Sequence, residues 1–268
     1  MELSKQVKLL IKTYKIFPSK KLGQNFLIKE TALSFIKDSI SPEQSKKYIE
    51  IGPGFLFLTE KVSPYVKEIF AIEKDKRFIP FYEEHTIENV KIIINDALKI
   101  KFDEFDADEL FGNIPYNIST DLILKIIESK KIKRAVLLLQ KEFAMRILSD
   151  VGGKNYSSIT VLIDFFFDKK FLKTFPPHFF YPKPGVSSTL IELRKKKLNE
   201  EIDQELFFEI VRSAFAQRRK KIVNTLSTRF DREKVQKALK LSGIAFNRRA
   251  ETLTLNDYKN LYEFLKNS

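Results

Sequence analysis

Short apolar runs that alternate with segments of helical spacing occupy the middle of this 268-residue chain. Runs rich in β-branched residues predict buried strands at Tyr48–Gly52, Glu68–Glu73, Val90–Asn95, Leu110–Asn113 and Ala135–Gln140. Apolar residues that recur every three or four positions predict the helices between them, at Phe57–Tyr65, Phe78–Glu84 and Thr120–Ser129. Strands that alternate with helices along a chain favour a mostly parallel, Rossmann-like α/β sheet.

The pattern changes toward the C-terminus. Two more β-rich segments, Ser157–Phe167 and Thr189–Arg194, predict strands at the end of the α/β region. Beyond them the spacing predicts only helices, at Gln204–Phe215, Arg219–Thr225, Arg232–Ser242 and Thr254–Lys266. The charged stretch 194–201 separates the two regions. We therefore expect an α/β domain with a basic N-terminal arm over residues 1–197, and a small all-helical domain over residues 198–268.

Positive charge is concentrated at the two ends of the chain, which carries 48 lysines and arginines against 35 aspartates and glutamates. Residues 1–21 contain six lysines and one glutamate, and residues 194–268 contain 18 basic and 10 acidic side chains. The middle, residues 22–193, contains 24 of each sign. A neutral body between basic ends is typical of a catalytic or ligand-binding domain flanked by polyanion-binding surfaces, and favours nucleic acid as the partner. The alternative is a basic surface that only keeps the protein in solution.

Composition excludes several classes of site. The absence of cysteine removes disulfides, thiolate metal ligands and cysteine nucleophiles. The two histidines, His85 and His178, lie far apart in sequence, so we expect no metal site. No apolar run approaches the roughly 18 residues that a membrane span needs, and the N-terminus lacks the pattern of a secretory signal. We expect a cytoplasmic, monomeric protein without a membrane partner.

The first 15 residues predict a helix with two distinct faces. Apolar side chains spaced four, three and four positions apart form one stripe, made of Leu3, Val7, Leu10 and Tyr14. Lysines spaced three, four and three positions apart form another, made of Lys5, Lys8, Lys12 and Lys15. The lysine face is either solvated or turned toward phosphates, and a helix lying on a membrane surface is a weaker alternative.

Three consecutive predicted strands end in residues that suit a ligand site. The first ends in the glycine-rich turn Glu50-Ile-Gly52-Pro-Gly54, which lets the backbone approach a ligand closely. Glu73 closes the second strand 21 positions after Gly52, a spacing that suits a carboxylate accepting hydrogen bonds from two ribose hydroxyls. Asp96 follows the third strand. Because sheets of this kind bind ligands at the carboxyl ends of their strands, the coincidence favours a nucleoside site over solvated strand-end residues.

Two features argue against a nucleotide that carries phosphates. A dinucleotide fingerprint requires a third glycine for close helix packing, and Phe57 occupies that position. The Gly-Lys-Ser/Thr sequence of a P-loop does not occur in the chain. We therefore expect S-adenosylmethionine as the cofactor.

The segment after the fourth strand, Phe111-Gly-Asn-Ile-Pro-Tyr-Asn117, offers the groups needed to methylate an exocyclic adenine amine. The lone pair of such an amine is delocalised into the ring, so the site must accept the amine hydrogens and aim the lone pair at a sulfonium methyl. The side-chain carbonyl of Asn113 and the backbone carbonyl of Ile114 supply acceptors, and Pro115 fixes the turn without adding an N–H donor. Tyr116 offers a ring on which a flipped base stacks. With the glycine turn and two acids upstream, this interpretation is favoured over a plain turn.

In this combination of motifs the chain resembles the ribosomal RNA adenine N6-dimethyltransferases, the KsgA-type enzymes and their Erm relatives. The resemblance runs from Lys21-Leu-Gly-Gln-Asn-Phe-Leu27, similar to the family's cofactor lid, to the final helix. Asn113-Ile-Pro-Tyr116 matches the N-[LI]-P-Y motif of N6-adenine transfer, and Phe180–Ser188 matches F-x-P-x-P-x-V-x-S. Gly185 and Ser187 depart from the family, which often has lysine and aspartate there.

The resemblance implies contacts to S-adenosylmethionine. Asn25 and Leu27 would touch the cofactor from the lid. Gly52 would contact its methionine portion, Glu73 its ribose and Asp96 its adenine. The full set of predicted cofactor residues is Gln24, Asn25, Leu27, Gly52, Gly54, Glu73, Lys74, Asp96, Ala97 and Asn113.

The resemblance also implies that Phe180 stacks on the target base opposite Tyr116. Without it, a core position is the preferred interpretation for Phe180, since the chain has 25 phenylalanines. The predicted catalytic set is Asn113, Ile114, Pro115, Tyr116 and Phe180.

Cation clusters near the C-terminus extend the resemblance. The segment Phe215–Lys221 opens a predicted helix with four consecutive cations, which form a phosphate-binding cluster or a solvated face. The KsgA group has a similar F-x-Q-R-R-K segment, and Asn247–Leu253 is similar to its C-terminal region, whereas the Erm group differs there. The predicted RNA contacts are Lys5, Lys8, Lys12, Lys15, Arg218, Arg219, Lys220, Lys221, Arg248 and Arg249.

The resemblance implies an enzyme that dimethylates the N6 amines of two adjacent adenosines near the 3′ end of small-subunit ribosomal RNA, in immature small subunits. Two alternatives stay open: an Erm-type methylase of large-subunit RNA, and a ribosome-assembly or RNA-binding factor whose catalysis is secondary. A DNA adenine methylase is less favoured, since the chain has no target-recognition domain beyond the small helical one.

Overall fold

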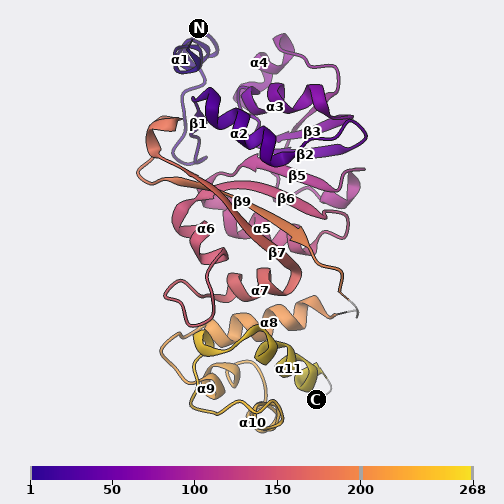
Figure 1. Ribbon diagram of the computed structural model, residues 1–268, viewed down its shortest axis with the longest axis vertical. Helices are drawn as coiled ribbons and strands as arrows, with labels where there is room; N and C mark the ends of the chain where they lie inside the picture. Colours follow the sequence, from indigo (N-terminus) through magenta and orange to yellow (C-terminus); the bar gives the residue numbers. More distant parts are fainter. Residues whose placement is uncertain (1, 199–201, 267–268) are drawn as a thin grey trace. The chain divides into compact units, whose positions relative to one another are not determined.

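A seven-stranded sheet and a two-stranded ribbon organise the computed structural model, which describes residues 2–198 and 202–266 (Figure 1). The strand order of the large sheet is β4-β3-β2-β5-β6-β9-β7. Its strands are β2 (Lys47–Ile51), β3 (Glu68–Glu73), β4 (Val90–Ile94), β5 (Glu109–Asn113), β6 (Arg134–Gln140), β7 (Phe167–Phe175) and β9 (Ser188–Lys195). The ribbon pairs β1 (Phe26–Leu27) with β8 (Phe180–Tyr181) in antiparallel register.

The five strands from β2 to β6 pair in parallel, and β9 lies antiparallel to β6. Strands β5 and β6 are buried along nearly their whole length, as parallel strands covered on both faces are. The predicted Rossmann-like α/β fold is confirmed. The five predicted central strands match β2 to β6 to within one residue at each end.

Helices connect these strands and follow them along the chain. They are α1 (Leu3–Tyr14), α2 (Glu30–Ile40), α3 (Phe57–Val62), α4 (Ile79–Glu84), α5 (Ser119–Glu128), α6 (Lys141–Ile147), α7 (Ser158–Phe166), α8 (Gln204–Phe215), α9 (Ile222–Leu226), α10 (Arg232–Leu241) and α11 (Leu255–Lys266). Helices α3, α4 and α5 lie where the apolar spacing predicts them, whereas α2, α6 and β7 were not predicted. No helix in the described part of the chain is long and apolar enough to cross a membrane.

Helix α1 has the two faces that its sequence predicts. In its predicted apolar stripe Val7 is buried and Leu3, Leu10 and Tyr14 are half-buried, and Ile11, which was not included in that stripe, is buried as well. The four predicted lysines are all exposed. The hydroxyl of Tyr14 donates a hydrogen bond of 2.5 Å to Glu84 in α4, so α1 is tied to the α/β body.

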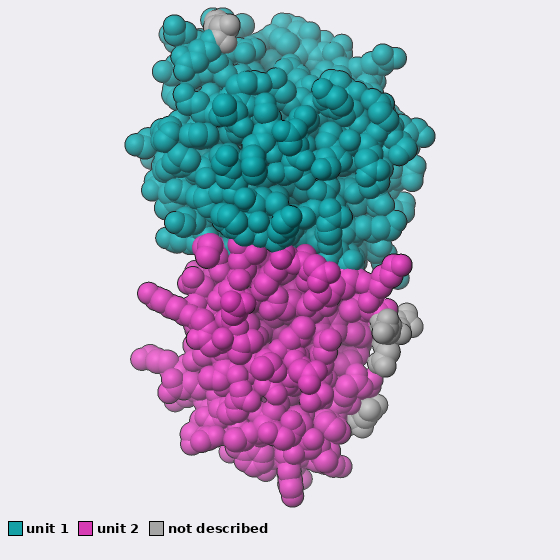
Figure 2. Space-filling view, in the orientation of Figure 1, with its two compact units in different colours: residues 1–144, 170–195 teal, residues 145–169, 196–268 magenta. Residues whose placement is uncertain are grey.

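The chain forms two compact units, coloured separately in Figure 2. Unit 1 comprises residues 1–144 and 170–195, and unit 2 comprises residues 145–169 and 196–268. The last of the three points where the chain passes from one unit to the other, after residue 195, lies close to the expected boundary at residue 197. Residues 145–169, however, which we expected in the α/β domain, belong to unit 2. The reason is packing: the ring of Phe165 in α7 lies 4.1 Å from that of Phe207 in α8, and the Tyr156 hydroxyl donates to the Leu253 carbonyl at 3.1 Å.

The strand predicted at Ser157–Phe167 is wrong, because this segment forms helix α7. Ser157 and Thr160 form a capping box at its start, in which the Ser157 N–H donates to the Thr160 hydroxyl at 3.1 Å. Seven of the nine residues of α7 are buried. A helix buried on nearly all sides has the same continuous apolar sequence as a buried strand, so periodicity alone cannot separate the two.

The helix predicted to begin within the cation cluster also differs from the structure. Helix α8 ends at Phe215, residues 216–221 form turns, and α9 begins only at Ile222. The N–H of Ile222 donates to the Arg248 carbonyl at 2.7 Å, which fixes where the next helix starts. Four consecutive cations offer no apolar face to pack, so the chain turns in solvent before helix formation resumes.

Candidate active site

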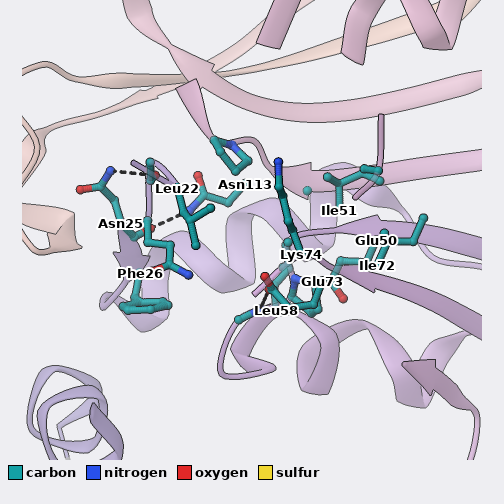
Figure 3. Close-up of a pocket in the computed structure, with 18 of the residues that line it drawn as sticks. Leu22, Asn25, Phe26, Glu50, Ile51, Leu58, Ile72, Glu73, Lys74 and Asn113 are labelled. Carbon is teal, nitrogen blue, oxygen red and sulfur yellow. Dashed lines mark hydrogen bonds between the residues drawn. The ribbon is translucent and has the colours of Figure 1, made fainter. Parts of the chain in front are cut away.

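A cavity lies at the carboxyl edge of the parallel strands in unit 1 (Figure 3). Its walls come from the turns after β2, β3, β4 and β5, and from residues 22–27. Parallel strands end at the same edge of a sheet, so side chains distant in sequence meet there. All ten residues of the predicted cofactor set line this cavity. Their contacts to a cofactor stay a prediction.

Two glycines shape the turn after β2. Gly52 and Gly54 have φ angles of 71° and 55°, in the left-handed region that favours glycine. A Cβ atom on Gly54 would lie 3.2 Å from the ring of Phe26. The Gly54 N–H donates a hydrogen bond to Glu73, with 3.3 Å between the nitrogen and Oε2. The turn therefore keeps the backbone open to a ligand and ties it to the acid at the end of β3.

Glu73 is an acid held in an apolar setting, with 7% of its surface exposed. Its Oε1 accepts a hydrogen bond of 2.8 Å from the N–H of Asp75. Burial raises the pKa of Glu73 to about 7, because the backbone N–H donors only partly replace the water lost by the carboxylate. A ligand that brings hydroxyl donors would favour the ionised form.

A second buried acid, Glu50, lies at the end of β2 with 2% of its surface exposed. Its Oε2 accepts a hydrogen bond of 2.7 Å from the Thr59 hydroxyl. Burial raises the pKa of Glu50 to about 8, so this carboxyl is largely protonated at neutral pH. Glu50 begins the glycine-rich motif, but it was not among the predicted site residues.

Asp96 lies at the mouth of the cavity with a cation beside it. Its Oδ2 lies 2.7 Å from the Lys74 ammonium, and its Oδ1 accepts a hydrogen bond of 3.0 Å from the Leu98 N–H. Partial burial opposes ionisation, but these two donors outweigh it and lower the pKa of Asp96. Asp96 is therefore a permanent acceptor at neutral pH.

The charges on the cavity wall select the class of ligand. Of the described residues that line it, Glu50, Glu73 and Asp96 are acids and Lys74 is the single base. Glu50 is largely neutral at pH 7 and Asp96 is paired with Lys74, so among these side chains only Glu73 adds net negative charge when it is ionised, and none of them offers an unpaired cation to a phosphate. The glycine turn, the buried acceptor and the apolar lining therefore fit S-adenosylmethionine, whose sulfonium and ammonium groups are both cationic.

Hydrogen bonds and an ion pair hold residues 21–27, the predicted lid, and the residues just before them against the turn that follows β3. The side chain of Gln24 donates to Asp75 Oδ2 at 2.8 Å and accepts from the Ser19 N–H at 2.9 Å. Arg77 forms an ion pair of 2.6 Å with Asp75 and donates to the Phe17 carbonyl at 3.0 Å. Asp75 and Arg77 were not among the predicted site residues. The sequence signal that could have identified them is the Asp-Lys-Arg run shortly after the strand-end Glu73, in Glu73-Lys-Asp-Lys-Arg77.

Asn113 is oriented by the lid. Its Nδ2 donates to the Asn25 backbone carbonyl at 2.8 Å, the contact drawn as a dashed line between these residues in Figure 3. Because a carbonyl can only accept, this bond directs the NH₂ of Asn113 toward the lid and leaves its Oδ1 as an acceptor for another partner. Asn117 repeats the link one turn later, donating to the Lys21 carbonyl at 3.1 Å.

The structure places the remaining predicted catalytic residues around this loop. Ile114 is buried and its N–H donates to the Leu138 carbonyl at 3.0 Å, while Pro115 lines the cavity. The Tyr116 hydroxyl lies 3.2 Å from Ser188 Oγ, which holds the ring in place. Phe180 pairs with Leu27 through β8 and β1, and only 2% of it is exposed. Stacking of Phe180 on a base stays a prediction.

The structure brings two of the predicted RNA-binding segments together within unit 2. The hydrogen bond between Ile222 and Arg248 joins the turn after α8 to the segment before α11. Residues 218–221 and Arg249 are exposed there. The Arg248 guanidinium is less available than these exposed cations, because it forms an ion pair of 3.2 Å with Asp257 and donates a hydrogen bond to the Thr252 hydroxyl. It stabilises the local fold, and its contact to RNA is untested.

Known proteins similar to this chain are ribosomal RNA methyltransferases. The family model described as ribosomal RNA adenine dimethylase matches residues 18–267 of this chain. The chain belongs to that family. Ribosomal RNA small subunit methyltransferase A of Natranaerobius thermophilus is 35% identical over 292 residues, covering 98% of this chain and 96% of the relative. The protein of the same name from Clostridium botulinum is 36% identical and covers 94% of this chain and 95% of the relative.

Solved structures agree with this membership. A dimethyladenosine transferase from Plasmodium falciparum is similar with a TM-score of 0.77 and 28% identity, covering 89% of this chain and 96% of that one. The 23S rRNA methyltransferase ErmE shares the fold with a TM-score of 0.66 and 22% identity, covering 90% and 99%. The chain is thus an adenine dimethylase of ribosomal RNA that uses S-adenosylmethionine.

The raised pKa of the buried Glu73 leads us to expect that cofactor affinity depends on pH. As pH falls through 7, the pKa of Glu73, the carboxylate is protonated and loses acceptor capacity, so S-adenosylmethionine should bind more weakly. Glu73→Ala should weaken binding about 10–100-fold above that pH, the range of a hydrogen bond to a charged group. Calorimetric titration measures both effects, with Glu60→Gln, a carboxyl outside the cavity, as control. Unchanged affinity in Glu73→Ala would contradict the ribose assignment.

Proposed function

We propose that this family member dimethylates the N6 amines of two adjacent adenosines near the 3′ end of small-subunit ribosomal RNA, during maturation of the small subunit. The names of the relatives with 35% and 36% identity support the small subunit as the substrate. The enzyme then acts as a monomer in the cytoplasm on immature subunits. Residues 1–197 would hold the catalytic site, and residues 198–268, with segment 145–169 packed against them, would contribute RNA contacts through the exposed cations of residues 218–221 and Arg249.

The bond between Asn113 Nδ2 and the Asn25 carbonyl carries the proposal. It leaves Asn113 Oδ1 as an acceptor on a residue that lines the cavity, and we assign the second acceptor role to the backbone carbonyl of the next residue, Ile114. An adenine amine that donates its hydrogens to these two oxygens would have its lone pair turned toward the cavity. Positioning and fixed dipoles of this kind are sufficient catalysis when the leaving group is neutral.

S-Adenosylmethionine supplies an electrophilic methyl group on a sulfonium when it is bound. Gly52 and Gly54 would hold its methionine portion, Glu73 would hold its ribose, and Asp96 would hold its adenine. Tyr116, fixed by Ser188, would carry the flipped base on its ring. No metal and no strong base is required by this arrangement of acceptors, since the amine loses its proton to solvent after transfer.

The test is methylation in vitro. Immature small subunits and isolated large-subunit RNA are incubated with labelled S-adenosylmethionine, and the modified bases are mapped. We expect dimethyladenosine at two neighbouring positions of the small subunit. Label confined to large-subunit RNA would favour the Erm-type alternative. Rescue of subunit maturation by an inactive Asn113 variant would favour the assembly-factor alternative.

The cation cluster after α8 predicts a change in salt dependence. Replacing Arg218 and Arg219 by glutamate should weaken RNA binding and reduce the slope of log affinity against log salt by about 0.7–0.9 for each phosphate that the protein no longer neutralises. Filter binding over a salt series measures the slope. A Glu209→Lys variant, changed on the outer face of α8, controls for effects of surface charge. A slope equal to that of the wild type would mean that the cluster is only solvated.

A further inference from the structure

The opposite edge of the large sheet carries a concentration of lysines that the activity does not use. A surface hollow in unit 1 is lined by Lys46, Lys47, Lys67, Lys130, Lys131 and Lys133, and we name it the amino-edge groove. Lys46 and Lys47 lie at the start of β2, Lys67 directly precedes β3, and Lys133 directly precedes β6. Because these strands are parallel, their amino ends meet at one edge, where their lysines gather.

Part of this lysine set builds the walls of the groove. Lys46 lies 3.0 Å from Glu109, Lys47 lies 3.1 Å from Asp106, and Lys133 lies 3.0 Å from Asp108. Backbone bonds fix the loops as well: the Lys67 N–H donates to the Lys46 carbonyl at 2.9 Å. The groove is therefore held in shape before any ligand arrives.

The other three lysines are not held by close ion pairs, although the charge of Asp106 acts on Lys67 and Lys131. Lys67, Lys130 and Lys131 are exposed, and within the described residues no acid lies at ion-pair distance from their ammonium groups. The Lys131 ammonium donates one hydrogen bond of 3.0 Å to the Phe105 carbonyl and keeps two further N–H donors. The backbone N–H groups of Lys130 and Lys131 both donate to Asp103 at 3.1 Å, so their loop is rigid. Exposed cations on a fixed loop are typical of phosphate contacts.

We propose that the amino-edge groove binds the phosphate backbone of the substrate RNA, at a site separate from the one that holds the target adenine. The inference rests on the proposed function, because it takes the RNA substrate from there. From β3 to β6 the groove spans three strand spacings, about 14 Å, which is enough for more than one phosphate. Strands of five or six residues separate the groove from the carboxyl edge by about 17–20 Å. One RNA molecule can therefore span the groove and the catalytic cavity.

The lining favours RNA over other partners. Ala107 is the only apolar residue among the described ones that line the groove, and it is buried. A membrane or an apolar protein surface would therefore find no anchor there. Acids pair with three of the six lysines, and the other three leave a positive field, which attracts a polyanion.

The test compares two triple variants with equal loss of charge. Lys67→Gln/Lys130→Gln/Lys131→Gln removes the groove cations that have no acid partner, and Lys234→Gln/Lys237→Gln/Lys240→Gln removes three exposed lysines of α10. Binding of a small-subunit RNA fragment is measured by fluorescence anisotropy over a salt series. We expect the groove variant to lower the slope of log affinity against log salt by about 2, at 0.7–0.9 per phosphate, with a smaller change in the α10 variant.

Two readouts separate this inference from the proposed function. Cofactor affinity and the rate at saturating RNA should equal those of the wild type in the groove variant, since no groove residue lines the catalytic cavity. An unchanged slope in a protein that still methylates would overturn the groove but leave the proposed function intact. Equal slope changes in both triple variants would also overturn it, because they would reflect net charge alone.

A spatial test uses the absence of cysteine in the chain. Lys130→Cys provides a unique attachment point for a photo-crosslinker in the groove. We expect capture of labelled small-subunit RNA that unlabelled RNA of the same sequence competes away. Failure to capture RNA under conditions where methylation proceeds would count against the groove.

Discussion

Asn113→Ala should reduce the rate of methyl transfer about 10²–10³-fold at saturating substrates, the usual effect of removing one positioned dipole from an active site. The structure supplies the reason: the lid fixes the amide through the Asn25 carbonyl, so Asn113 Oδ1 is aimed before the substrate binds. Alanine removes the acceptor but leaves the glycine turn, Glu73 and Asp96 in place. We therefore expect S-adenosylmethionine affinity to change only a few-fold.

The matched control is Asn117→Ala, four residues along the same loop. That amide also donates to the lid, at the Lys21 carbonyl, but it is exposed. Its loss should loosen the lid slightly and leave the rate within about tenfold of the wild type. Single-turnover kinetics and calorimetry separate rate from cofactor affinity. Equal losses of rate and of cofactor affinity in Asn113→Ala would show that the residue serves the lid and not the adenine.

Gly112→Ala should destabilise unit 1 and disable the site together. A Cβ atom at this position would lie 2.5 Å from the Ile51 carbonyl oxygen in β2, a clash with backbone that no side-chain rotation relieves. Overpacking of this kind costs about 3 kcal/mol or more, which lowers the melting temperature by roughly 6–12 °C in a chain of this size. Strands β2 and β5 must move apart, and this displaces Asn113, the next residue.

Thermal unfolding and methylation rates measure the two effects of Gly112→Ala. Gly185→Ala provides the control, because a Cβ atom there would meet nothing within 4 Å. We expect that control to change the free energy of unfolding by less than about 0.5 kcal/mol. A Gly112→Ala protein with the stability of the wild type would mean that the β2–β5 pair has more room than the structure indicates.

The carboxyl edge of the sheet was predictable because local sequence and fold class point to the same place. Each acid or glycine of the predicted cofactor set lies at the end of a strand or within three residues after it, and parallel pairing brings those strand ends together. The walls between them were not predictable. Leu33 and Leu58 line the cavity, and nothing in their local sequence separates them from ordinary core residues.

Helix α7 and the amino-edge groove show two limits of local patterns. The apolar run at 158–166 fits strand and helix equally, and the choice was made by its packing on α8, whose sequence begins more than 35 residues later. The groove could not be found by counting charges. Residues 22–193 carry equal numbers of acids and bases, yet the fold places acids around the carboxyl-edge cavity and lysines around the amino-edge groove.

By itself the sequence determined the α/β class and the helical C-terminal region, and it singled out the strand-end acids and the asparagine that line the cavity, whose roles toward cofactor and adenine stay predictions. These depend on strand periodicity and on residues adjacent to strand ends, which are local properties. Only the tertiary structure decided that segment 145–169 belongs with the C-terminal helices, that the lid orients Asn113, and that scattered lysines form one groove. Each of these is a contact between segments far apart in the chain, and such contacts arise from packing, which no local pattern encodes.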